Sequence, residues 1–279
     1  MDGYFTIKEV VEKYIEGCQT KMQMSSRRLL GKAAMAGMMI AMGAGISSVA
    51  AHTISDVGLA RLAAAIVFPV GLMMVILLGA ELFTGDCLVA MSIFDGKQKI
   101  KDCVKLLFLV YTGNLIGATL TAWFISMSGQ LNYSSGMLGA YTIKLAIGKA
   151  NISFMQGIIS GILCNILVCA AILMAMCAKD ITGKLLVSFF VIMLFVTGGF
   201  EHCVANMYYI TAGLLALSNP GYVEQAIQAY GFSVEYLETL NVANFLIKNL
   251  LPVTIGNIIG GAFFIGAPVY YLNCEKVKQ

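Results

Sequence analysis

The chain has 279 residues, of which 59% are hydrophobic and only 12% are charged, and its formal net charge is +3. Soluble domains typically have about 25% charged residues, so this composition predicts an integral membrane protein without room for a large soluble domain. The chain has no basic stripe, and its aromatic residues lie in apolar runs, which argues against nucleic-acid binding.

The amino-terminal segment is expected to form an amphipathic helix on the cytoplasmic side of the membrane. Apolar residues recur at helical spacing between positions 7 and 18, with charged residues between them. Such a helix could lie on the membrane surface, cover the mouth of a pore, or pack on the cytoplasmic face of the same protein. The sequence leaves these three arrangements open.

Six apolar runs follow, each long enough to supply the roughly 20 residues that a helix needs to cross a bilayer. The second and fifth runs are longer than a single span requires. A polar stretch covers residues 128–153, and a loop covers 218–243. The predicted spans are residues 31–51, 59–94, 103–127, 154–178, 185–217 and 245–272.

Both long runs are interrupted near their centres by polar residues and glycine. Residues 81–86 interrupt the second span, and Glu201 and His202 follow the Gly198-Gly199 step in the fifth. A charged side chain in mid-membrane costs about 2.5–3.5 kcal/mol on insertion scales, and glycine loosens the backbone. We therefore predict two broken helices whose interruptions line a polar pathway. The alternative is a buried structural pair that caps two half-helices.

The two halves of the chain also share a motif. The sequence GNLIGA at 113–118 in the third span matches GNIIGG at 256–261 in the sixth, and the two broken spans correspond in the same way. Each half has three spans, an odd number, so the halves insert with opposite topology. The predicted fold is an all-α membrane protein with six transmembrane helices in a 3+3 inverted repeat, similar in architecture to aquaporins. The two Asn-Pro-Ala boxes of aquaporins are missing.

The basic residues are unevenly distributed around the spans. Fourteen of the eighteen lysines and arginines fall on the side of the amino terminus in this topology. Because such residues are concentrated in cytoplasmic segments, both termini of this multi-pass protein are predicted to be cytoplasmic. The four basic residues on the other side are Arg61, Lys144, Lys149 and Lys248.

Four segments, in this order on the six spans, resemble the formate/nitrite transporter family, and the resemblance covers nearly the whole chain. They are GAELFTG at 79–85, CNILVC at 164–169, FEHCVANM at 200–207 and NLLPVTIGN at 249–257.

The resemblance implies a homopentamer in the cell membrane, with one pore through each protomer. It implies a channel or transporter, not an enzyme, for small monovalent anions of weak acids such as formate, nitrite and hydrosulfide. No cofactor is implied, and eight cysteines without a CxxC pair favour neither a metal site nor a disulfide framework. The amphipathic pattern and the spans divide the chain into a cytoplasmic amphipathic helix in 1–28, a six-span channel domain in 29–273 and a cytoplasmic tail in 274–279.

Matched motif by motif, the resemblance implies His202 at the centre of the pore, with Glu201 and Asn206 as neighbours. Thr84 would face His202, Asn165 would lie close by, and Lys149 would lie in the external vestibule. Many family members have Asn where this chain has Asp86. The implied hydrophobic constrictions are Phe68 and Phe195 on the outer side and Leu72, Phe83 and Val168 on the inner side.

Each polar candidate also has a structural interpretation. His202 could donate a hydrogen bond or a proton to an anion, or it could hold the broken helix together. Thr84 could contact an anion or His202, or it could cap the second half-helix. Lys149 could concentrate anions, or its side chain could extend toward lipid headgroups.

Four further polar residues are interpreted mainly as structural. Glu81 and Glu201 are expected to bond backbone groups that the breaks set free. Asn114 and Asn257 are expected to bond between helices or to the broken backbone.

Three other functions remain to be weighed against an anion channel. A membrane scaffold is disfavoured because it gives no reason for the Glu201-His202 pair at the break. A neutral-solute channel of the aquaporin type is disfavoured by the missing Asn-Pro-Ala boxes. A membrane-embedded enzyme is disfavoured because the chain has only two histidines and lacks both an HExxH motif and a cysteine cluster.

Overall fold

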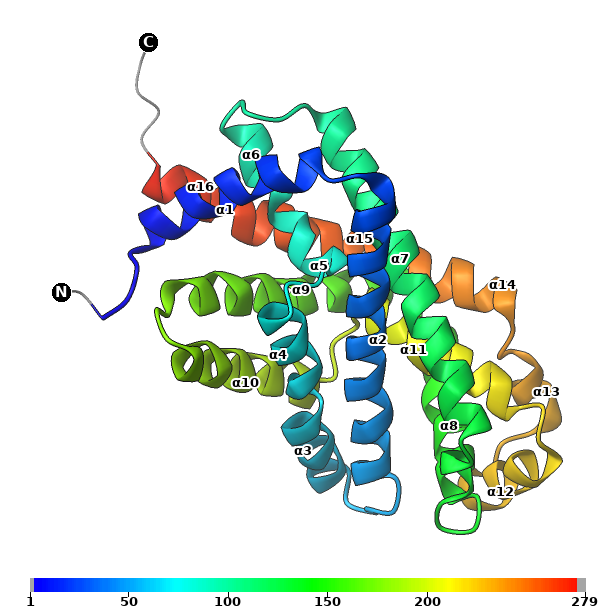
Figure 1. Cartoon of the computed structure of the whole chain (residues 1–279). Helices are drawn as coiled ribbons and strands as arrows, with labels where there is room; N and C mark the ends of the chain where they lie inside the picture. The colour runs from blue at the N-terminus through cyan, green and yellow to red at the C-terminus, as the bar shows by residue number, and fades with distance from the viewer. Residues whose placement is uncertain (1–2, 275–279) are drawn as a thin grey trace.

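The structure is a computed structural model that describes residues 3–274, and its regular structure is helical (Figure 1). Within that range, six helices are long and apolar enough to cross a membrane, which confirms the six predicted spans. They are Ser26–Ala51, Val57–Leu77, Ile100–Met127, Phe154–Cys177, Ile181–Gly198 and Val242–Asn273. Of the predicted tail, only Cys274 lies within the described residues.

The first half of the chain runs from the N-terminal helix to the third span. Its helices are α1 (Ile7–Gln23), α2 (Ser26–Ala51), α3 (Val57–Val67), α4 (Pro69–Leu77), α5 (Phe83–Asp86), η1 (Cys87–Val89), α6 (Ala90–Phe94) and α7 (Ile100–Met127).

The second half repeats this plan after a connecting segment. Its helices are η2 (Gln130–Asn132), α8 (Met137–Ala150), α9 (Phe154–Cys177), α10 (Ile181–Gly198), α11 (Cys203–Ala216), α12 (Pro220–Tyr230), α13 (Val234–Glu238), α14 (Val242–Asn244), η3 (Phe245–Leu250), α15 (Leu251–Ile258), η4 (Ile259–Gly266) and α16 (Ala267–Asn273).

The second and fifth spans are broken, as predicted. In the second, α4 ends at Leu77 and α5 begins at Phe83; in the fifth, α10 ends at Gly198 and α11 begins at Cys203. Each break contains a glycine with a left-handed backbone, Gly79 with φ of 63° and Gly199 with φ of 69°. Only glycine adopts this conformation at little cost, so the glycines allow the chain to leave one helix and enter the next.

The shared GNxxG motif lets two pairs of helices cross closely. A Cβ atom at Gly117 of α7 would lie 1.9 Å from the backbone oxygen of Ala34 in α2. At the matching position, a Cβ at Gly260 would lie 2.4 Å from the oxygen of Ile162 in α9. Small residues permit such backbone contact between helices in lipid, so the repeat seen in the sequence is a repeat of packing.

Two segments outside the predicted spans, a polar stretch and a loop, contain helices. The polar stretch 128–153 includes α8, which packs against α11 and α12, and the loop 218–243 includes α12 and α13. The buried side chains of α8 include Leu138, Ile143 and Ile147. Helix α8 was not predicted in this stretch from the sequence, because its apolar face is covered by other helices.

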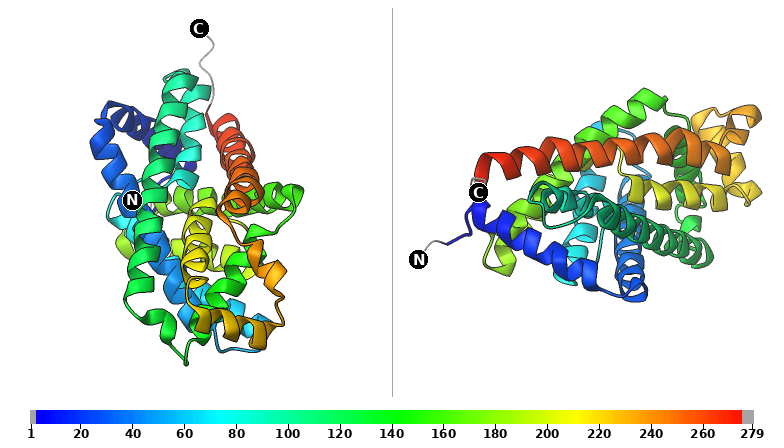
Figure 2. Two further views of the ribbon diagram at one scale, coloured as in Figure 1. Left: turned by 90° about the vertical axis from the view of Figure 1, so that its right-hand side faces the viewer. Right: turned by 90° about the horizontal axis from the view of Figure 1, so that it is seen from above.

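The N-terminal helix α1 lies across one end of the helical bundle, against α6, α9 and α16 (Figure 2). A capping box between Thr6 and Glu9 begins the helix, as expected for such a pair. Its buried face consists of Val10, Val11, Tyr14, Ile15 and Cys18. Packing on the same protein is therefore observed.

We expect Gly117→Ala to destabilise the protein by about 1–3 kcal/mol, because the added methyl group overlaps the backbone of α2 and forces the helices apart. Heating in mild detergent followed by size-exclusion chromatography would measure the loss of folded protein. The control is Gly31→Ala in α2, where a Cβ meets nothing within 4 Å. Alanine is the better helix former, so this control should be as stable as the parent. Equal stability of Gly117→Ala would contradict the packing argument.

Candidate functional site

Two cavities enter the protein from opposite ends. The near cavity, on the side of α1, has a volume of about 260 Å³ and is lined by Tyr14, Lys21, Leu72 and Asp86 among others. The far cavity has a volume of about 410 Å³, and its lining includes Phe68 and His202. Phe68 and Leu72 are one helical turn apart, roughly 6 Å along the axis. The two cavities therefore approach each other at the level of the breaks.

His202 and Thr84 meet between the two breaks. The Nε2 atom of His202 lies 3.0 Å from the hydroxyl oxygen of Thr84, and both side chains are buried. His202 is also the N-cap of α11, because its Nδ1 atom accepts a hydrogen bond from the backbone N–H of Ala205 at 3.1 Å. The alternative in which Thr84 caps the second half-helix is not observed, since no side chain caps α5.

The hydrogen bonds of His202 define its tautomer. A ring nitrogen that accepts an N–H bond carries no proton, so a neutral His202 has its proton on Nε2. That Nε2–H then donates to the Thr84 hydroxyl oxygen, and the Thr84 O–H is left to donate elsewhere. If Nδ1 were protonated, its N–H would face the backbone N–H of Ala205, and two donors would repel each other. The arrangement therefore favours the neutral imidazole.

Two asparagines hold the broken backbones in place, in equivalent ways. Asn114 of α7 accepts a hydrogen bond from the N–H of Phe83 at 2.9 Å and donates to the oxygens of Ala33 and Glu81. Asn257 of α15 accepts from the N–H of Cys203 at 2.9 Å and donates to the oxygens of Gly161 and Glu201. The expectation that these asparagines bond the broken backbone agrees with this geometry.

Asn165 belongs to the wall around the central pair. Its amide donates to the backbone oxygens of Thr84 at 3.0 Å and Asn257 at 2.6 Å. The side chain thus ties the first break to the helix that holds the second. It is fully buried, and it is not among the residues that line the two cavities.

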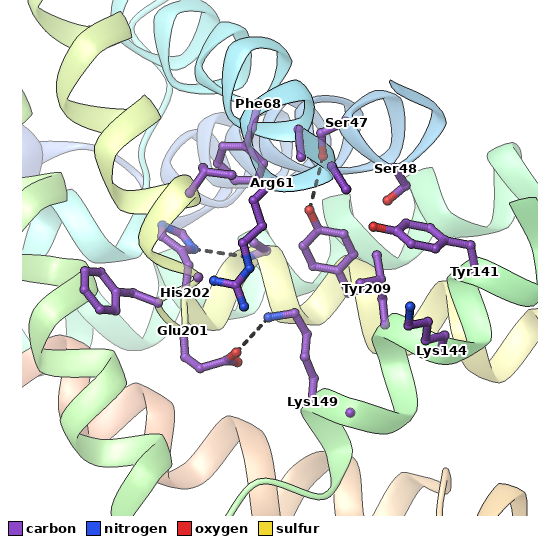
Figure 3. A pocket seen from close by; sticks show the side chains of 18 of the residues that line it. Ser47, Ser48, Arg61, Phe68, Tyr141, Lys144, Lys149, Glu201, His202 and Tyr209 are labelled. Carbon is purple, nitrogen blue, oxygen red and sulfur yellow. Dashed lines mark hydrogen bonds and ion pairs between the residues drawn. The ribbon is translucent and has the colours of Figure 1, made fainter. Parts of the chain in front are cut away.

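Glu201 is part of a polar network on the side of the far cavity (Figure 3). Its carboxylate accepts hydrogen bonds from Lys149 at 2.9 Å, Asn206 at 2.6 Å and Asn249 at 3.3 Å. The expectation that Glu201 bonds the freed backbone groups was therefore wrong, because the partners of its carboxylate are side chains. Asparagine amides satisfy those groups, and the carboxylate is left to hold Lys149 in the cavity.

The residues expected to form constrictions are all buried, but they occupy different surroundings. Phe68 and Phe195 pack edge to face with ring centroids 5.6 Å apart, and Phe195 lies 5.9 Å from the His202 ring. The two rings and His202 all line the far cavity. Leu72 lines the near cavity, while Phe83 packs against Tyr111, and neither Phe83 nor Val168 is among the cavity-lining residues.

The near cavity has an ionic cluster that the sequence analysis missed. Lys21 of α1 reaches Asp86 at 2.5 Å and Glu81 at 2.6 Å, and Lys32 lies 3.7 Å from Glu81. Burial alone would lower the pKa of Lys21, but the two carboxylates raise it above its ordinary value, so the ammonium group stays charged. The signal in the sequence was a lysine on the apolar face of α1, three residues after Cys18.

The Lys21 cluster gives a role to Asp86, the position at which many family members have Asn. A carboxylate at this position gives the lysine from α1 a second charged partner beside Glu81. Tyr14 adds a hydrogen bond from its hydroxyl to the backbone oxygen of Gly85 at 3.1 Å. Helix α1 is therefore fixed to the first break through side chains as well as through apolar packing.

Comparison with known proteins identifies the family. The sequence profile described as "Formate/nitrite transporter" matches residues 8–271, which is nearly the whole chain. The chain belongs to the formate/nitrite transporter family. This confirms the resemblance seen in the four motifs, and it makes the protein a channel or transporter and not an enzyme.

Individual relatives in the formate/nitrite transporter family support the same assignment. The formate channel FocA of Haemophilus influenzae is 37% identical over 77% of this chain and 75% of its own length. The uncharacterized transporter YrhG of Bacillus subtilis is 36% identical over 96% of this chain and 93% of its own length.

Solved structures of family members have the same fold. A pentameric formate channel with formate bound has a TM-score of 0.77 at 29% identity, covering 88% of this chain and 97% of that chain. A further ion channel of the family has a TM-score of 0.79 at 24% identity, covering 95% and 98%. At that identity the second comparison supports the fold alone.

We expect Asn257→Asp to destabilise this family member by about 2–5 kcal/mol. The substitution keeps an acceptor for the N–H of Cys203, but it removes both donors and leaves the oxygens of Gly161 and Glu201 without their bonds. The measurement is the thermal loss of folded protein in detergent.

The matched control is Asn273→Asp. The amide of Asn273 donates to the backbone oxygen of Val269 in its own helix and not to a broken span. This control should unfold at nearly the parent temperature. An Asn257→Asp protein that is as stable as the parent would show that the asparagine does not hold the break.

Proposed function

We propose that this chain forms a passive channel or transporter for small monovalent weak-acid anions, namely formate, nitrite or hydrosulfide, across the cell membrane. The name of the FocA relative and the formate bound in the similar pentameric channel support this substrate class. By the same likeness we propose a homopentamer with one pathway through each protomer. The charge distribution of the sequence supports a cytoplasmic location for both termini, which makes the far cavity external.

The observation that carries the proposal is the buried His202–Thr84 pair between two cavities. A bare anion leaves water only at high cost unless a hydrogen-bond donor meets it. With the imidazole proton directed at Thr84, the Thr84 O–H is free to donate to an anion at the centre of the pathway. A hydrogen bond to a charged group contributes about 1.5–3 kcal/mol, which offsets part of the desolvation cost.

The same geometry favours hydrogen-bond donation over proton donation by His202. A neutral imidazole that gave up its Nε2 proton would become an anion in a buried site, which is strongly disfavoured. A second proton would have to occupy Nδ1, which accepts the bond from Ala205. We therefore propose that His202 orients Thr84 and that the anion is stabilised without receiving a proton from the histidine.

The phenylalanine pair provides the proposed size limit. Phe68 and Phe195 line the far cavity together with His202, and rotation of two rings in edge-to-face contact could admit a small anion to the histidine. On the near side, Leu72, Phe83 and Val168 remain proposed constrictions, of which Leu72 is the one that lines a cavity.

Lys149 is the proposed anion-attracting group of the far cavity. Its ammonium group is bonded to Glu201 and lies 5.3 Å from the centroid of the Tyr209 ring. These contacts direct the side chain into the cavity and not toward the headgroup region, which supports the vestibule interpretation. Asn206 stabilises this arrangement through Glu201.

We expect Thr84→Val to lower formate flux by roughly 10- to 100-fold, because the shape is kept while the hydrogen-bond donor to the anion is lost. Thr84→Ser keeps the hydroxyl and should retain most of the flux. Proteoliposome uptake of formate between about pH 5 and 8, the range in which an unperturbed histidine changes charge, is the measurement. Flux through an assembled Thr84→Val protein at the parent level would refute the central role of the hydroxyl.

His202 can be tested in the same assay. His202→Asn keeps a good N-cap for α11 and should assemble normally, whereas its flux should fall because Thr84 is no longer oriented. His202→Phe removes the cap as well and should also lose about 0.5–2 kcal/mol of stability. Parent flux in an assembled His202→Phe protein would rule out the proposed role of the imidazole.

We expect Phe195→Ala to raise lactate flux relative to formate, because one ring of the pair that limits size is removed. Phe190→Ala is the control, since this ring lies on the same helix but is exposed on the protein surface. The measurement is the ratio of the two fluxes in proteoliposomes. An unchanged ratio in a folded Phe195→Ala protein would count against this constriction.

A further inference from the structure

The far cavity has more positive than negative charge, in contrast to the near cavity. Its lining includes three cations, Arg61, Lys144 and Lys149, but only one acid, Glu201. The near cavity is lined by Lys13 and Lys21 and by the two acids Glu81 and Asp86. A cleft lined by charge of one sign, with walls of low dielectric constant, raises the local concentration of the opposite ion.

The three cations of the far cavity differ in how they are engaged. Lys149 is paired with Glu201, and Lys144 lies 4.5 Å from the centroid of the Tyr230 ring. Arg61 has no carboxylate within 4.0 Å among residues 3–274. Lys144 also has no carboxylate within 4.0 Å among these residues, so two cations of this cavity are not neutralised by an acid, and Arg61 is the one with a planar fork of donors.

Arg61 is held at the entrance to the phenylalanine pair by the end of α10. One of its amino groups, Nη1, donates to the backbone oxygen of Thr197 at 3.4 Å. The guanidinium also packs directly on Gly199, where an added Cβ atom would lie 2.4 Å from Nη1. The C-terminal end of a helix carries partial negative charge and attracts cations, so these contacts fix the position of the group.

The remaining donors of Arg61 lie in the cavity. A guanidinium has five N–H donors in a planar fork, and the contact with Thr197 uses one of them. In Figure 3 the side chain extends from α3 into the pocket, toward the side where His202, Glu201 and Lys149 lie. An anion that enters the far cavity thus meets Arg61 before it reaches Phe68 and Phe195.

We infer that Arg61 is a specificity-determining residue that binds planar oxyanions, such as formate and nitrite, in the far cavity before they pass the phenylalanine pair. Formate and nitrite each present two oxygens in one plane, which match two parallel N–H bonds of a guanidinium. Hydrosulfide presents a single sulfur and gains only the attraction of the charge. The inference rests on the proposed function, because it names which of the proposed anions this vestibule favours.

The test measures how flux into proteoliposomes depends on the concentration of formate, nitrite and hydrosulfide at low ionic strength. It compares the parent protein with Arg61→Lys, Arg61→Gln and Lys144→Gln. Arg61→Lys keeps the charge but not the fork. It should raise the half-saturating concentration of formate and nitrite by roughly three- to tenfold, the effect of one partly exposed charge-assisted hydrogen bond. Its saturating flux and its hydrosulfide curve should match the parent.

The other variants separate charge from geometry. Arg61→Gln removes the charge too, so all three anions should require higher concentrations, with formate and nitrite affected most. Lys144→Gln removes a cation of the same cavity and should shift the three anions alike. Size-exclusion chromatography would establish that each variant assembles. If Arg61→Gln does not assemble, the comparison of Arg61→Lys with the parent still tests the role of Arg61.

Several outcomes would overturn the inference. An Arg61→Lys formate curve equal to that of the parent would remove it, and so would an equal shift for hydrosulfide. A lower saturating flux for all three anions would show that Arg61 only supports the end of α10. If the parent carries hydrosulfide but neither oxyanion, the Arg61 inference fails while anion transport stands. If the parent carries none of the anions, the proposed function fails and the inference fails with it.

Discussion

The freed backbone groups of the two broken spans are the constraint on which this structure depends. Where a helix stops inside a membrane, its N–H and C=O groups have no water to bond, and each unsatisfied group costs several kcal/mol. Asn114 and Asn257 meet this requirement with the same three bonds. Each asparagine reaches its break because the glycines of the GNxxG motif bring the helix that carries it against a neighbour.

These anchors also position the centre of the proposed pathway. The N–H of Phe83, which Asn114 holds, is adjacent to Thr84, and the N–H of Cys203, which Asn257 holds, is adjacent to His202. The polar pair therefore stands on two backbone segments that are each fixed from the side. Asn165 then joins the two anchors by bonding the oxygens of Thr84 and Asn257. The three asparagines thus fix the positions of Thr84 and His202, although none of the three lines a cavity.

The symmetry of the repeat ends at the two cavities. Glu81 and Glu201 occupy equivalent places before the two half-helices, but the cation nearest to each comes from a helix outside the repeat. Glu81 pairs with Lys21 of α1, while Glu201 pairs with Lys149 near the end of α8. Together with Asp86 and Arg61, these partners make the near cavity balanced in charge and the far cavity cationic. The repeat thus builds the centre of the proposed pathway, and the added helices give each cavity a different charge.

The features that the bilayer imposes could be predicted from the sequence. Span length, the two breaks and the paired GNxxG motifs could be read directly, because lipid requires long apolar runs and makes every polar interruption conspicuous. The roles of Asn114 and Asn257 followed from the same reasoning, since freed backbone groups need partners.

The features that depend on which side chains meet after folding could be found in the structure but not in the sequence. Helix α8 packs against α11 and α12, and its position in a polar stretch gave no sign of this contact. The partners of Glu201 lie 52, 5 and 48 positions away along the chain, and Lys21 meets Asp86 across 65 positions. The tautomer of His202 depends on its bonds to Ala205 and Thr84, and the placement of Arg61 depends on the end of α10. Periodicity and composition report which faces are apolar, but they do not report which polar groups meet once those faces have packed.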